Sequence, residues 1–443
     1  MTRAMKNSGV EWIGQIPESW NTIRLKMIAP ILRGASPRPI NDPKYFDDNG
    51  NYYWVRINDV TKSNGYLYSC AQKLSNIGAE LSVKLEPNTL FISICATLGK
   101  PCITKIPCCI HDGFIYFYRL DKRLNKYLYY VFEAGKCFEG LAKLGTQQNL
   151  NTFLIGNIKI ALPYNHKQIQ AIADYLDDKC AQIDNITATI NEQIEVLKQY
   201  KKSVITEAVT KGLDPNVPMK DSGVEWIGQI PEKWNIERFK YNFSFAKGLQ
   251  ITKADLTEEG CPVISYGQIH SKINTGVNVN SELIRFVSTD YQYEKSSIAK
   301  YGDIIWADTS EDYEGIGNSI FINCSKNIFA GYHTIITKPL FNSITKYFAY
   351  LFQTDVWRLQ LRKQATGIKV FSITQKMLKN CNILIPSIPE QQVISDYLDD
   401  KCAQIDAVIA DKQAQLETLA AYKKSLIYEC VTGKKSVPGF EEA

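Results

Sequence analysis

The chain of 443 residues lacks any long run of apolar residues. No stretch approaches the roughly 18 consecutive apolar residues that mark a membrane-spanning helix, and the first segment, MTRAMKNSGVEW, contains no apolar signal core. A strong excess of one charge is also missing, because 51 lysines and arginines stand against 46 aspartates and glutamates. We therefore expect a cytoplasmic protein without membrane association, whose net charge alone does not identify a polyanionic partner.

Residue patterns typical of catalysis are scarce. The sequence has no G-x-x-x-x-G-K-[ST] phosphate loop, no Asn-Pro-Pro-Tyr-type methyltransferase signature and no glycine-rich dinucleotide turn. The twelve cysteines of so long a chain fit reduced thiols, since disulfide-dense scaffolds are usually small. Cys102, Cys108 and Cys109 lack the paired C-x-x-C spacing of a zinc site, so we interpret them as core residues. The sequence predicts a chain without a catalytic, metal or cofactor site of its own.

The sequence is an internal duplication. Residues 5–26, MKNSGVEWIGQIPESWNTIRLK, return as residues 219–240, MKDSGVEWIGQIPEKWNIERFK, with 17 of 22 positions identical. The segment DYLDDKCAQID occurs at 174–184 and again at 396–406 without a mismatch. The repeated segments match closely, while the sequences between them differ widely. This contrast predicts one repeated scaffold that holds two different globular bodies.

The duplication divides the chain into four parts. We place the first body with its common segment at 1–160 and a first common helix at 161–218. The second body with its common segment follows at 219–384, and a second common helix at 385–443.

Both bodies contain strand-like and helix-like sequence. Helices are predicted over 124–143 and 344–363, late in each body. Strands are predicted where β-branched and aromatic runs are bounded by Gly, Pro and Asn, over 52–57, 90–94, 114–118, 262–266, 303–306 and 334–337. This mixture predicts two globular domains of the α/β (α+β) class.

Each common helix carries an apolar stripe with heptad spacing. In the first, predicted over 169–210, the stripe includes Ile186 and a strict series of sevens at Leu176, Ile183, Ile190, Leu197 and Val204. The second, predicted over 391–431, repeats the pattern. Because the first helix leads to the second body and the second helix begins there, the stripes cover each other only if the helices run antiparallel. We therefore predict a long antiparallel two-helix coiled coil that separates the bodies, with one body near each end and an approximate two-fold axis between them.

Side chains able to contact DNA lie in loops beside the predicted strands. Without their common segments, the first body (27–160) has 16 lysines and arginines against 10 acids, and the second (241–384) has 15 against 12, which is also compatible with an ordinary solvated surface. Arg or Lys can donate hydrogen bonds to guanine, Asn or Gln can pair with adenine, and Asp or Glu can accept a hydrogen bond from cytosine. The candidates are Arg33, Arg38, Arg56, Asn58, Gln147, Gln148 and Asn149 in the first body, and Lys247, Gln250, Gln268, His270, Thr309, Glu311, Asp312, Thr366 and Lys369 in the second.

Taken together, these features resemble the specificity subunits of type I restriction–modification systems. The resemblance rests on SGVEWIGQIPE-x-W before each body, on a hydrophobic strand that ends in proline after it, and on Glu390-Gln391-Gln392 at the start of the second helix. The first copy departs from this pattern, with His166-Lys167-Gln168 at the corresponding place. The resemblance implies a non-catalytic subunit in which each body reads one half of a split, asymmetric double-stranded DNA target and the coiled coil sets the length of the spacer.

The resemblance also implies partner subunits. Two methyltransferase (modification) subunits would dock on the common regions and supply S-adenosylmethionine chemistry. Restriction subunits would supply translocation and cleavage that depend on ATP and magnesium. The residues expected to contact partners are Trp12 and Trp226 in the common segments and the acid pairs Asp177-Asp178 and Asp399-Asp400 on the exposed face of the helices.

Other classes of function stay open at this point. A stand-alone duplicated DNA-binding regulator would need no modification partner and would bind its site tightly alone. A coiled-coil adaptor would show no salt-dependent binding to DNA. An enzyme fused to its own reader would carry a methyltransferase motif, which this sequence lacks.

Overall fold

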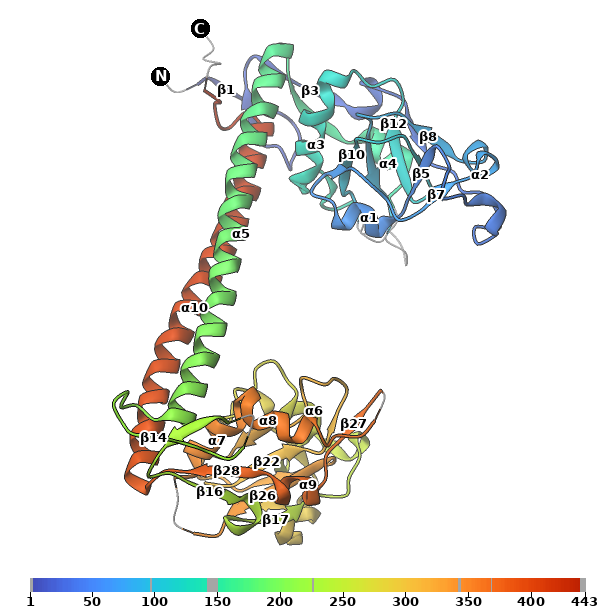
Figure 1. The fold of residues 1–443 in the computed structure, drawn as a ribbon. Helices are drawn as coiled ribbons and strands as arrows, with labels where there is room; N and C mark the ends of the chain where they lie inside the picture. The colour runs from blue at the N-terminus through green and yellow to red at the C-terminus, as the bar shows by residue number, and fades with distance from the viewer. Residues whose placement is uncertain are drawn as a thin grey trace. The chain divides into compact units, whose positions relative to one another are not determined.

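The computed structural model describes residues 3–95, 98–141, 150–224, 227–341, 344–367 and 369–438 of the chain. The fold has two compact units, Met1–Asn191 with Gln413–Ala443, and Glu192–Lys412. Each unit contains one globular body and a part of each of two long helices (Figure 1). Among the described residues, no helix combines the length and the apolar character that crossing a bilayer requires.

The first body is built on two sheets, and its helices are α1 (Ile57–Lys62), α2 (Asn76–Glu80), α3 (Asn125–Glu133) and α4 (Thr152–Asn157). The order of the five-stranded sheet is β4 (Ile31–Arg33), β12 (Phe114–Phe117), β9 (Leu90–Ser93), β10 (Pro101–Thr104) and β6 (Tyr66–Leu67). The order of the four-stranded sheet is β7 (Lys73–Leu74), β5 (Tyr52–Val55), β11 (Cys108–Ile110) and β8 (Val83–Leu85). Strands β9, β10 and β11 are buried along their whole length, which explains their short, mostly apolar sequences.

The second body repeats this plan, with the helices α6 (Tyr266–Ile269), α7 (Thr345–Gln353), α8 (Asp355–Arg362) and α9 (Gln375–Asn380). The order of its four-stranded sheet is β17 (Phe243–Lys247), β26 (Thr334–Pro339), β22 (Ile304–Ala307) and β24 (Ser319–Phe321). The order of its five-stranded sheet is β18 (Leu256–Thr257), β20 (Arg285–Val287), β19 (Cys261–Ile264), β25 (Ile328–Ala330) and β21 (Ile298–Ala299). A short pair, β23 (Thr309–Ser310) with β27 (Phe371–Ser372), is added to this plan. The predicted mixed α/β class is confirmed for both bodies.

The helices predicted late in each body are shorter than expected. In the described part of 124–143, α3 ends just before Gly135, a residue with a φ of 73°, and only a single 3-10 turn, Lys136–Phe138, follows it. Such a left-handed conformation stops a helix and favours glycine. The segment 344–363 forms α7 and α8, separated by the extended Thr354, whose side chain accepts a hydrogen bond from the amide of Trp357. Both boundaries are therefore set by local capping.

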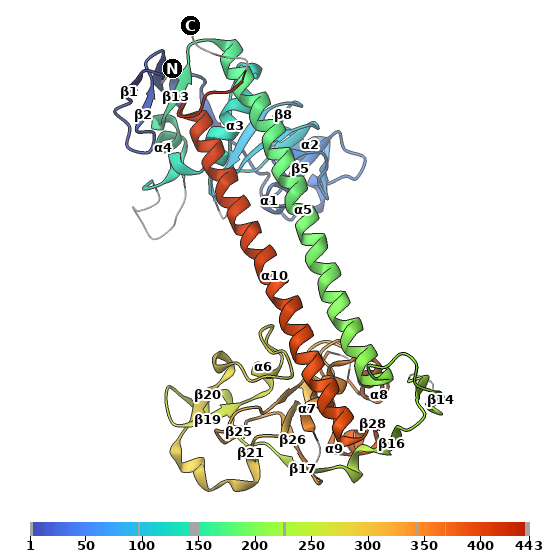
Figure 2. The ribbon, with the colours of Figure 1, turned by 90° about the vertical axis from the view of Figure 1, so that its left-hand side faces the viewer.

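Two long helices, α5 (His166–Lys211) and α10 (Ile388–Val431), pack together (Figures 1 and 2). In the first unit Lys423 binds Asp184, and in the second unit Lys201 binds Asp406, each over 2.6 Å. Partner numbers on α10 fall as those on α5 rise, so the predicted antiparallel pairing is confirmed. The 46 residues of α5 correspond to about 69 Å of helix at about 1.5 Å per residue.

The apolar seam between the helices follows the predicted heptads, with one exception. Leu176, Ile183 and Ile190 are buried, but Ile186 is 49% exposed. Buried seam residues alternate steps of four and three, as in Leu176, Cys180 and Ile183, and a second step of three in succession leaves the seam. Residue 186 is three positions after Ile183, which at 100° per residue turns it about 60° to one side. The prediction that Ile186 belongs to the buried stripe is therefore wrong.

The common segments close each body with short antiparallel strands. In the first unit β1 (Met5–Asn7) pairs with β2 (Gln15–Pro17), and β3 (Trp20–Arg24) pairs with β13 (Lys159–Pro163). In the second unit β14 (Met219–Asp221) pairs with β15 (Gln229–Pro231), and β16 (Asn235–Arg238) pairs with β28 (Asn382–Ile385). The first pairing of each unit lies within the common segment, and the second joins that segment to the strand that precedes a long helix.

A buried tryptophan marks the end of each common segment. Trp20 and Trp234 are each 1% exposed. Trp20 lies against Gly433, just after α10, and Trp234 lies against Gly212, just after α5. The identical IPE-x-W motifs therefore serve to pack the common segments onto the ends of the long helices.

A repeated set of polar contacts fastens each body to a long helix. In the first unit Tyr130 of α3 donates to Asp177 of α5 over 2.7 Å, and Lys126 binds the same carboxylate. Tyr127 of α3 donates to the carbonyl oxygen of Val431, at the end of α10, over 2.9 Å. Burial and the Asp177 carboxylate raise the pKa of Tyr130, so its hydroxyl remains a donor. We call this set the body latch.

The second unit contains the same latch. Tyr350 and Lys346 of α7 donate to Asp399 of α10 over 2.7 Å and 2.5 Å. Tyr347 donates to the carbonyl oxygen of Val209, near the end of α5, over 3.0 Å. The motif K-Y-x-x-Y therefore recurs within two bodies whose sequences otherwise diverge.

Candidate nucleic-acid interface

Two predicted DNA-contacting arginines of the first body meet at one loop. Arg33 ends β4, and its Nε donates to the carbonyl oxygen of Asp112 over 2.5 Å. Arg38 donates to the Asp112 carboxylate over 2.9 Å, and Ser36 donates to it over 2.9 Å. Arg38 remains 71% exposed while it makes this contact. The arrangement holds two cations beside one another at the surface, with the charge of only one carboxylate between them.

Asp112 is a functional candidate that sequence reasoning missed. Burial opposes its ionisation, but the Ser36 hydrogen bond and the charges of Arg38, His111 and Arg33 lower the pKa of its carboxyl group. It is therefore ionised at neutral pH and orients both arginines. The sequence signal was the His-Asp-Gly triplet before a strongly apolar strand.

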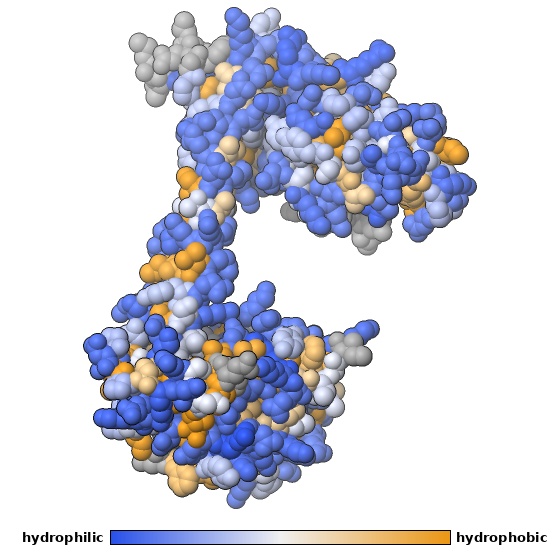
Figure 3. Space-filling model, viewed as in Figure 1, coloured by the Kyte–Doolittle hydropathy of each residue, from blue (hydrophilic) through white to orange (hydrophobic). Residues whose placement is uncertain are grey.

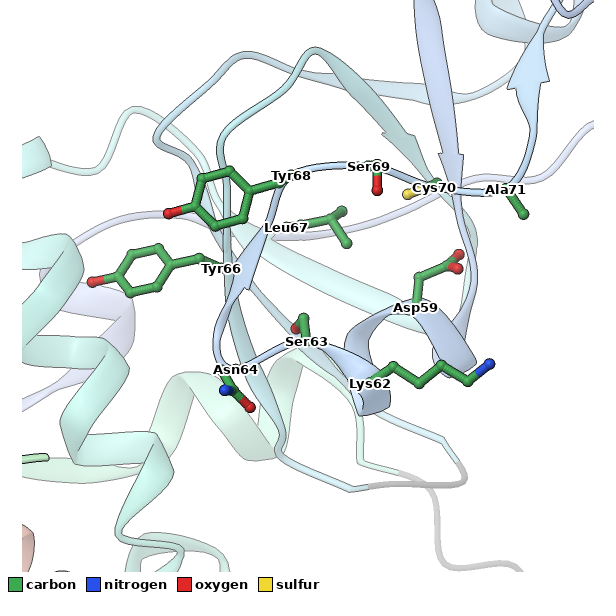
Figure 4. Close-up of a pocket in the computed structure, with 10 residues that line it drawn as sticks. All are labelled: Asp59, Lys62, Ser63, Asn64, Tyr66, Leu67, Tyr68, Ser69, Cys70 and Ala71. Carbon is green, nitrogen blue, oxygen red and sulfur yellow. The ribbon is translucent and has the colours of Figure 1, made fainter. Parts of the chain in front are cut away.

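Two other candidates of the first body lie at the start of α1. Arg56 and Asn58 are exposed there, and Asp59 accepts a hydrogen bond from the Arg56 amide over 2.8 Å. A pocket of about 600 Å³ lies beside this helix. Figure 4 shows the rings of Tyr66 and Tyr68 on one side of it and Asp59 and Lys62 on the other. Tyr68 is 68% exposed and offers a stacking surface near the predicted readers.

Three further candidates of this body, Gln147, Gln148 and Asn149, lie outside the described residues.

In the second body Lys247 occupies the place that Arg33 has in the first. Arg33 pairs with Ile115, the second residue of β12, and Lys247 pairs with Ile335, the second residue of β26. A glycine follows each cation, because a Cβ there would lie 2.2 Å from a carbonyl oxygen at Gly34 and 2.1 Å from one at Gly248. Arg33 of the first body and Lys247 of the second body therefore occupy equivalent positions in equivalent sheets.

Lys247 and Gln250 line one pocket of about 590 Å³ together with Asp308 and His333. His333 Nδ1 lies 3.3 Å from the Asp308 carboxylate, and Thr309 donates to the same carboxylate over 2.8 Å. The fold therefore brings Lys247 and Gln250 close to the segment of Thr309, although they precede it by about 60 positions in the sequence. Gln375 and Lys376, which sequence reasoning missed, also line this pocket.

A neighbouring pocket of about 540 Å³ collects three other candidates. Glu311 and Asp312 are exposed there beside His270. Both ring nitrogens of His270 contact protein atoms, Nε2 the carbonyl oxygen of Thr309 at 2.8 Å and Nδ1 the amide nitrogen of Asn318 at 3.0 Å. The predicted base contact by His270 would have to compete with these bonds.

The remaining candidates of the second body have mixed surroundings. The Gln268 side chain accepts a hydrogen bond from the Ser265 amide over 3.1 Å and so caps α6. Thr366 forms an isolated bridge with Ser372, and Lys369 is exposed in the same segment. None of these three residues is among those that line the pocket of Lys247 and Gln250.

Some of the side chains predicted to contact partner subunits make hydrogen bonds within the chain instead. Trp12 donates to the carbonyl oxygen of Lys159 over 3.2 Å. The expectation that all four acids lie on the exposed face is wrong for Asp177 and Asp399, because the body latches occupy both carboxylates. Asp178 and Asp400 are exposed as expected, and Trp226 lies outside the described residues.

Sequence comparison identifies the family. The pattern of the family described as "Type I restriction modification DNA specificity domain" matches residues 17–196 and 231–418. The MjaVIII specificity subunit of Methanocaldococcus jannaschii is 26% identical over 95% of this chain and 94% of its own. The putative MjaX specificity subunit of the same organism is 26% identical over 95% of each chain. The EcoBI specificity subunit of Escherichia coli is 20% identical over 95% of this chain and 87% of its own.

Solved structures share the fold. A chain in a structure described as "Structural basis underlying complex assembly and conformational transition of the type I R-M system" has a TM-score of 0.72 and 14% identity over 95% of this chain and 99% of its own. The HsdS subunit from Thermoanaerobacter tengcongensis has a TM-score of 0.52 and 14% identity over 95% and 98% of the two chains. Because the family pattern covers most of both halves, the chain belongs to the type I restriction–modification DNA specificity family and is a DNA-target recognition subunit of such a system.

Proposed function

We propose that the chain reads a two-part, asymmetric double-stranded DNA target, with one half bound by each body. The observation that carries this proposal is the pair Arg33 and Lys247, two different cations at the same position of a duplicated sheet. Because the two positions are equivalent, Arg33 and Lys247 lie in the same relation to the repeated scaffold of their own unit. The different surrounding side chains then give each half of the target its own sequence.

The helices α5 and α10 serve in this proposal as the spacer between the two halves. Three heptads inserted into each helix, after Asn191 and after Lys412, lengthen the rod by about 31 Å, which is close to one turn of DNA at about 34–36 Å. We expect the unspecified spacer of the methylated motif to grow by about nine or ten base pairs.

Methylome sequencing measures this spacer directly. A single inserted heptad is the matched control, since it adds about 10 Å and turns the second half-site out of phase on the duplex, so methylation should be lost. An unchanged spacer after the three-heptad insertion would contradict the role of the helices.

Modification subunits bind, we propose, to two equivalent patches on the paired helices. Ile186 and Tyr422 are 49% exposed, and their repeat counterparts Val408 and Tyr200 are 46% and 48% exposed. Helical phase at 100° per residue puts Ile186 and Tyr422 on the flank opposite the Asp184–Lys423 ion pair. Figure 3 shows hydrophobic surface on the otherwise hydrophilic helices. Two patches support two copies of a methyltransferase subunit, which supplies the S-adenosylmethionine chemistry.

Charged substitutions test these patches separately. Ile186→Glu should weaken one modification site at least tenfold, because a buried apolar anchor is worth about 2 kcal/mol or more. The double variant with Val408→Glu should abolish both sites. Native mass spectrometry should then show two, one and no bound methyltransferase subunits in the intact, single and double forms. Asn185→Glu, on the outer face of α5, is the control, and an equal loss with this control would contradict the assignment.

Restriction subunits that use ATP and magnesium would join the complex formed with the modification subunits. One observation supports an assembly of this kind. The relatives that the chain matches are described as subunits of restriction enzymes.

A further inference from the structure

Arg358 of α8 is a buried cation that contacts no carboxylate in the part of the chain that the structure describes. Its side chain donates to the carbonyl oxygen of Phe352 over 2.9 Å, to Oε1 of Gln353 over 2.5 Å and to Oδ1 of Asn318 over 2.6 Å. Burial lowers the pKa of Arg358 to about 10, so it remains charged at neutral pH. A buried charge is costly unless hydrogen bonds compensate it, and here three neutral oxygens do so.

The arginine fixes the orientation of Asn318. A guanidinium group only donates hydrogen bonds, so the amide oxygen of Asn318 must face Arg358. The amide nitrogen then faces Nδ1 of His270, at 3.0 Å.

Asn318 in turn fixes the tautomer of His270. Nδ1 must accept from the asparagine, so the ring proton lies on Nε2, which donates to the carbonyl oxygen of Thr309 over 2.8 Å. Four residues are thus connected in one order, from the buried arginine to the base of a surface loop.

That loop spans residues 308–318, and we call it the recognition loop. It contains the predicted DNA contacts Thr309, Glu311 and Asp312. A second buried arginine, Arg362, lies one turn further along α8 and donates to the carbonyl oxygen of Glu314 over 2.9 Å. The loop is therefore held near its middle by Arg362 and at its end by Arg358, while residues 311–314 remain exposed.

The first body has a different arrangement at the corresponding places. Lys100 and Glu133, the counterparts of Asn318 and Gln353 in strand and helix, form an ion pair over 3.2 Å. Thr61 stands where the second body has His270, in the helix after the matching strand. Among the described residues, the connected set is therefore found in the second body and not in the first.

We propose that Arg358, Asn318 and His270 are positioning residues that fix the recognition loop of the second body and thereby determine discrimination in one half of the DNA target. The inference rests on the proposed function, since it assumes that this loop meets DNA. It assigns His270 a role through Thr309 rather than a direct contact with a base.

Two substitutions of His270 separate the links of the set. In His270→Gln the amide nitrogen reaches the place of Nε2 and still donates to Thr309, but the link to Asn318 is lost. In His270→Asn the amide oxygen stands at the place of Nδ1 and still accepts from Asn318, but the link to Thr309 is lost. The pair is matched in polarity, so both variants impose a similar burden on folding.

The experiment measures discrimination in each half of the target separately. The full chain is expressed with its modification subunits, the methylated motif is determined, and binding competition uses duplexes substituted in one half. His270→Asn should lower discrimination in the second half at least tenfold and leave the first half unchanged. His270→Gln should stay within about threefold of the intact chain, because it keeps the bond to the loop.

Asn318→Leu provides an independent variant, which should relax the second half like His270→Asn while Arg358 remains in place. Equal discrimination by folded His270→Asn and intact chains would overturn the inference, and so would an equal loss in both halves. Failure of the proposed function is a distinct result, since the intact chain would then give no two-part motif at all.

Discussion

Replacing Arg33 by alanine is expected to relax one half of the DNA target and to leave the other half unchanged. A bidentate contact to a base contributes about 1–3 kcal/mol, which corresponds to about a 5- to 150-fold loss of discrimination at one base pair. Lys247→Ala should relax the opposite half, because Lys247 occupies the equivalent place in the second body. Competition binding with duplexes substituted in one half measures both effects.

Charge-matched variants in the common segments provide the control. Arg24 ends β3 and Arg238 ends β16, and both are exposed in strands that close the bodies. Alanine at either position removes one positive charge and should change neither half of the motif. A uniform loss of affinity with Arg33→Ala, equal for all sequences and reduced at high salt, would assign Arg33 to phosphate contact instead.

Trp234→Ala is expected to destabilise the second unit by about 3–5 kcal/mol, the usual cost of truncating a large buried aromatic side chain. The indole is 1% exposed and lies against Gly212 and Tyr347. Its loss removes the packing between the common segment and the end of α5. Hydrogen exchange should show faster exchange in residues 192–412 than in the intact chain.

Trp234→Phe is the milder companion of this variant. Among the described residues the Trp234 Nε1 makes no hydrogen bond, so phenylalanine removes ring volume but no bond. Its cost should be well below that of alanine. Trp20→Ala should have the mirrored effect on the first unit, and faster exchange in the second unit with Trp20→Ala would contradict the equivalence of the two tryptophans.

The large features of the fold could be predicted because they follow from repetition and period. The heptad series through Ile183 and Ile190 predicted the long helix, and the chain order predicted its antiparallel partner. The error at Ile186 arose because two successive steps of three, from Cys180 through Ile183, carry residue 186 onto the flank of the helix, where sequence alone does not separate a packing site from a docking site.

The candidate site could be predicted only in part, since its residues converge from distant segments. Arg33 and Lys247 were found from residue type and position beside strands. Asp112 and the buried Arg358 were missed, because their importance depends on what they contact and not on their own neighbours in sequence. The K-Y-x-x-Y motif of the body latches was present in both bodies but was hidden by the divergence around it.

The central claim is that each body reads its own half of a split DNA target. Methylome sequencing of cells that contain the modification subunits, with the intact chain, without it, and with its Lys247→Ala variant, tests that claim most directly. The account predicts a motif of two short specified parts around an unspecified spacer, absent without the chain and degenerate in one part only with the variant. A continuous motif, a motif that persists without the chain, or degeneracy spread over both parts would contradict it.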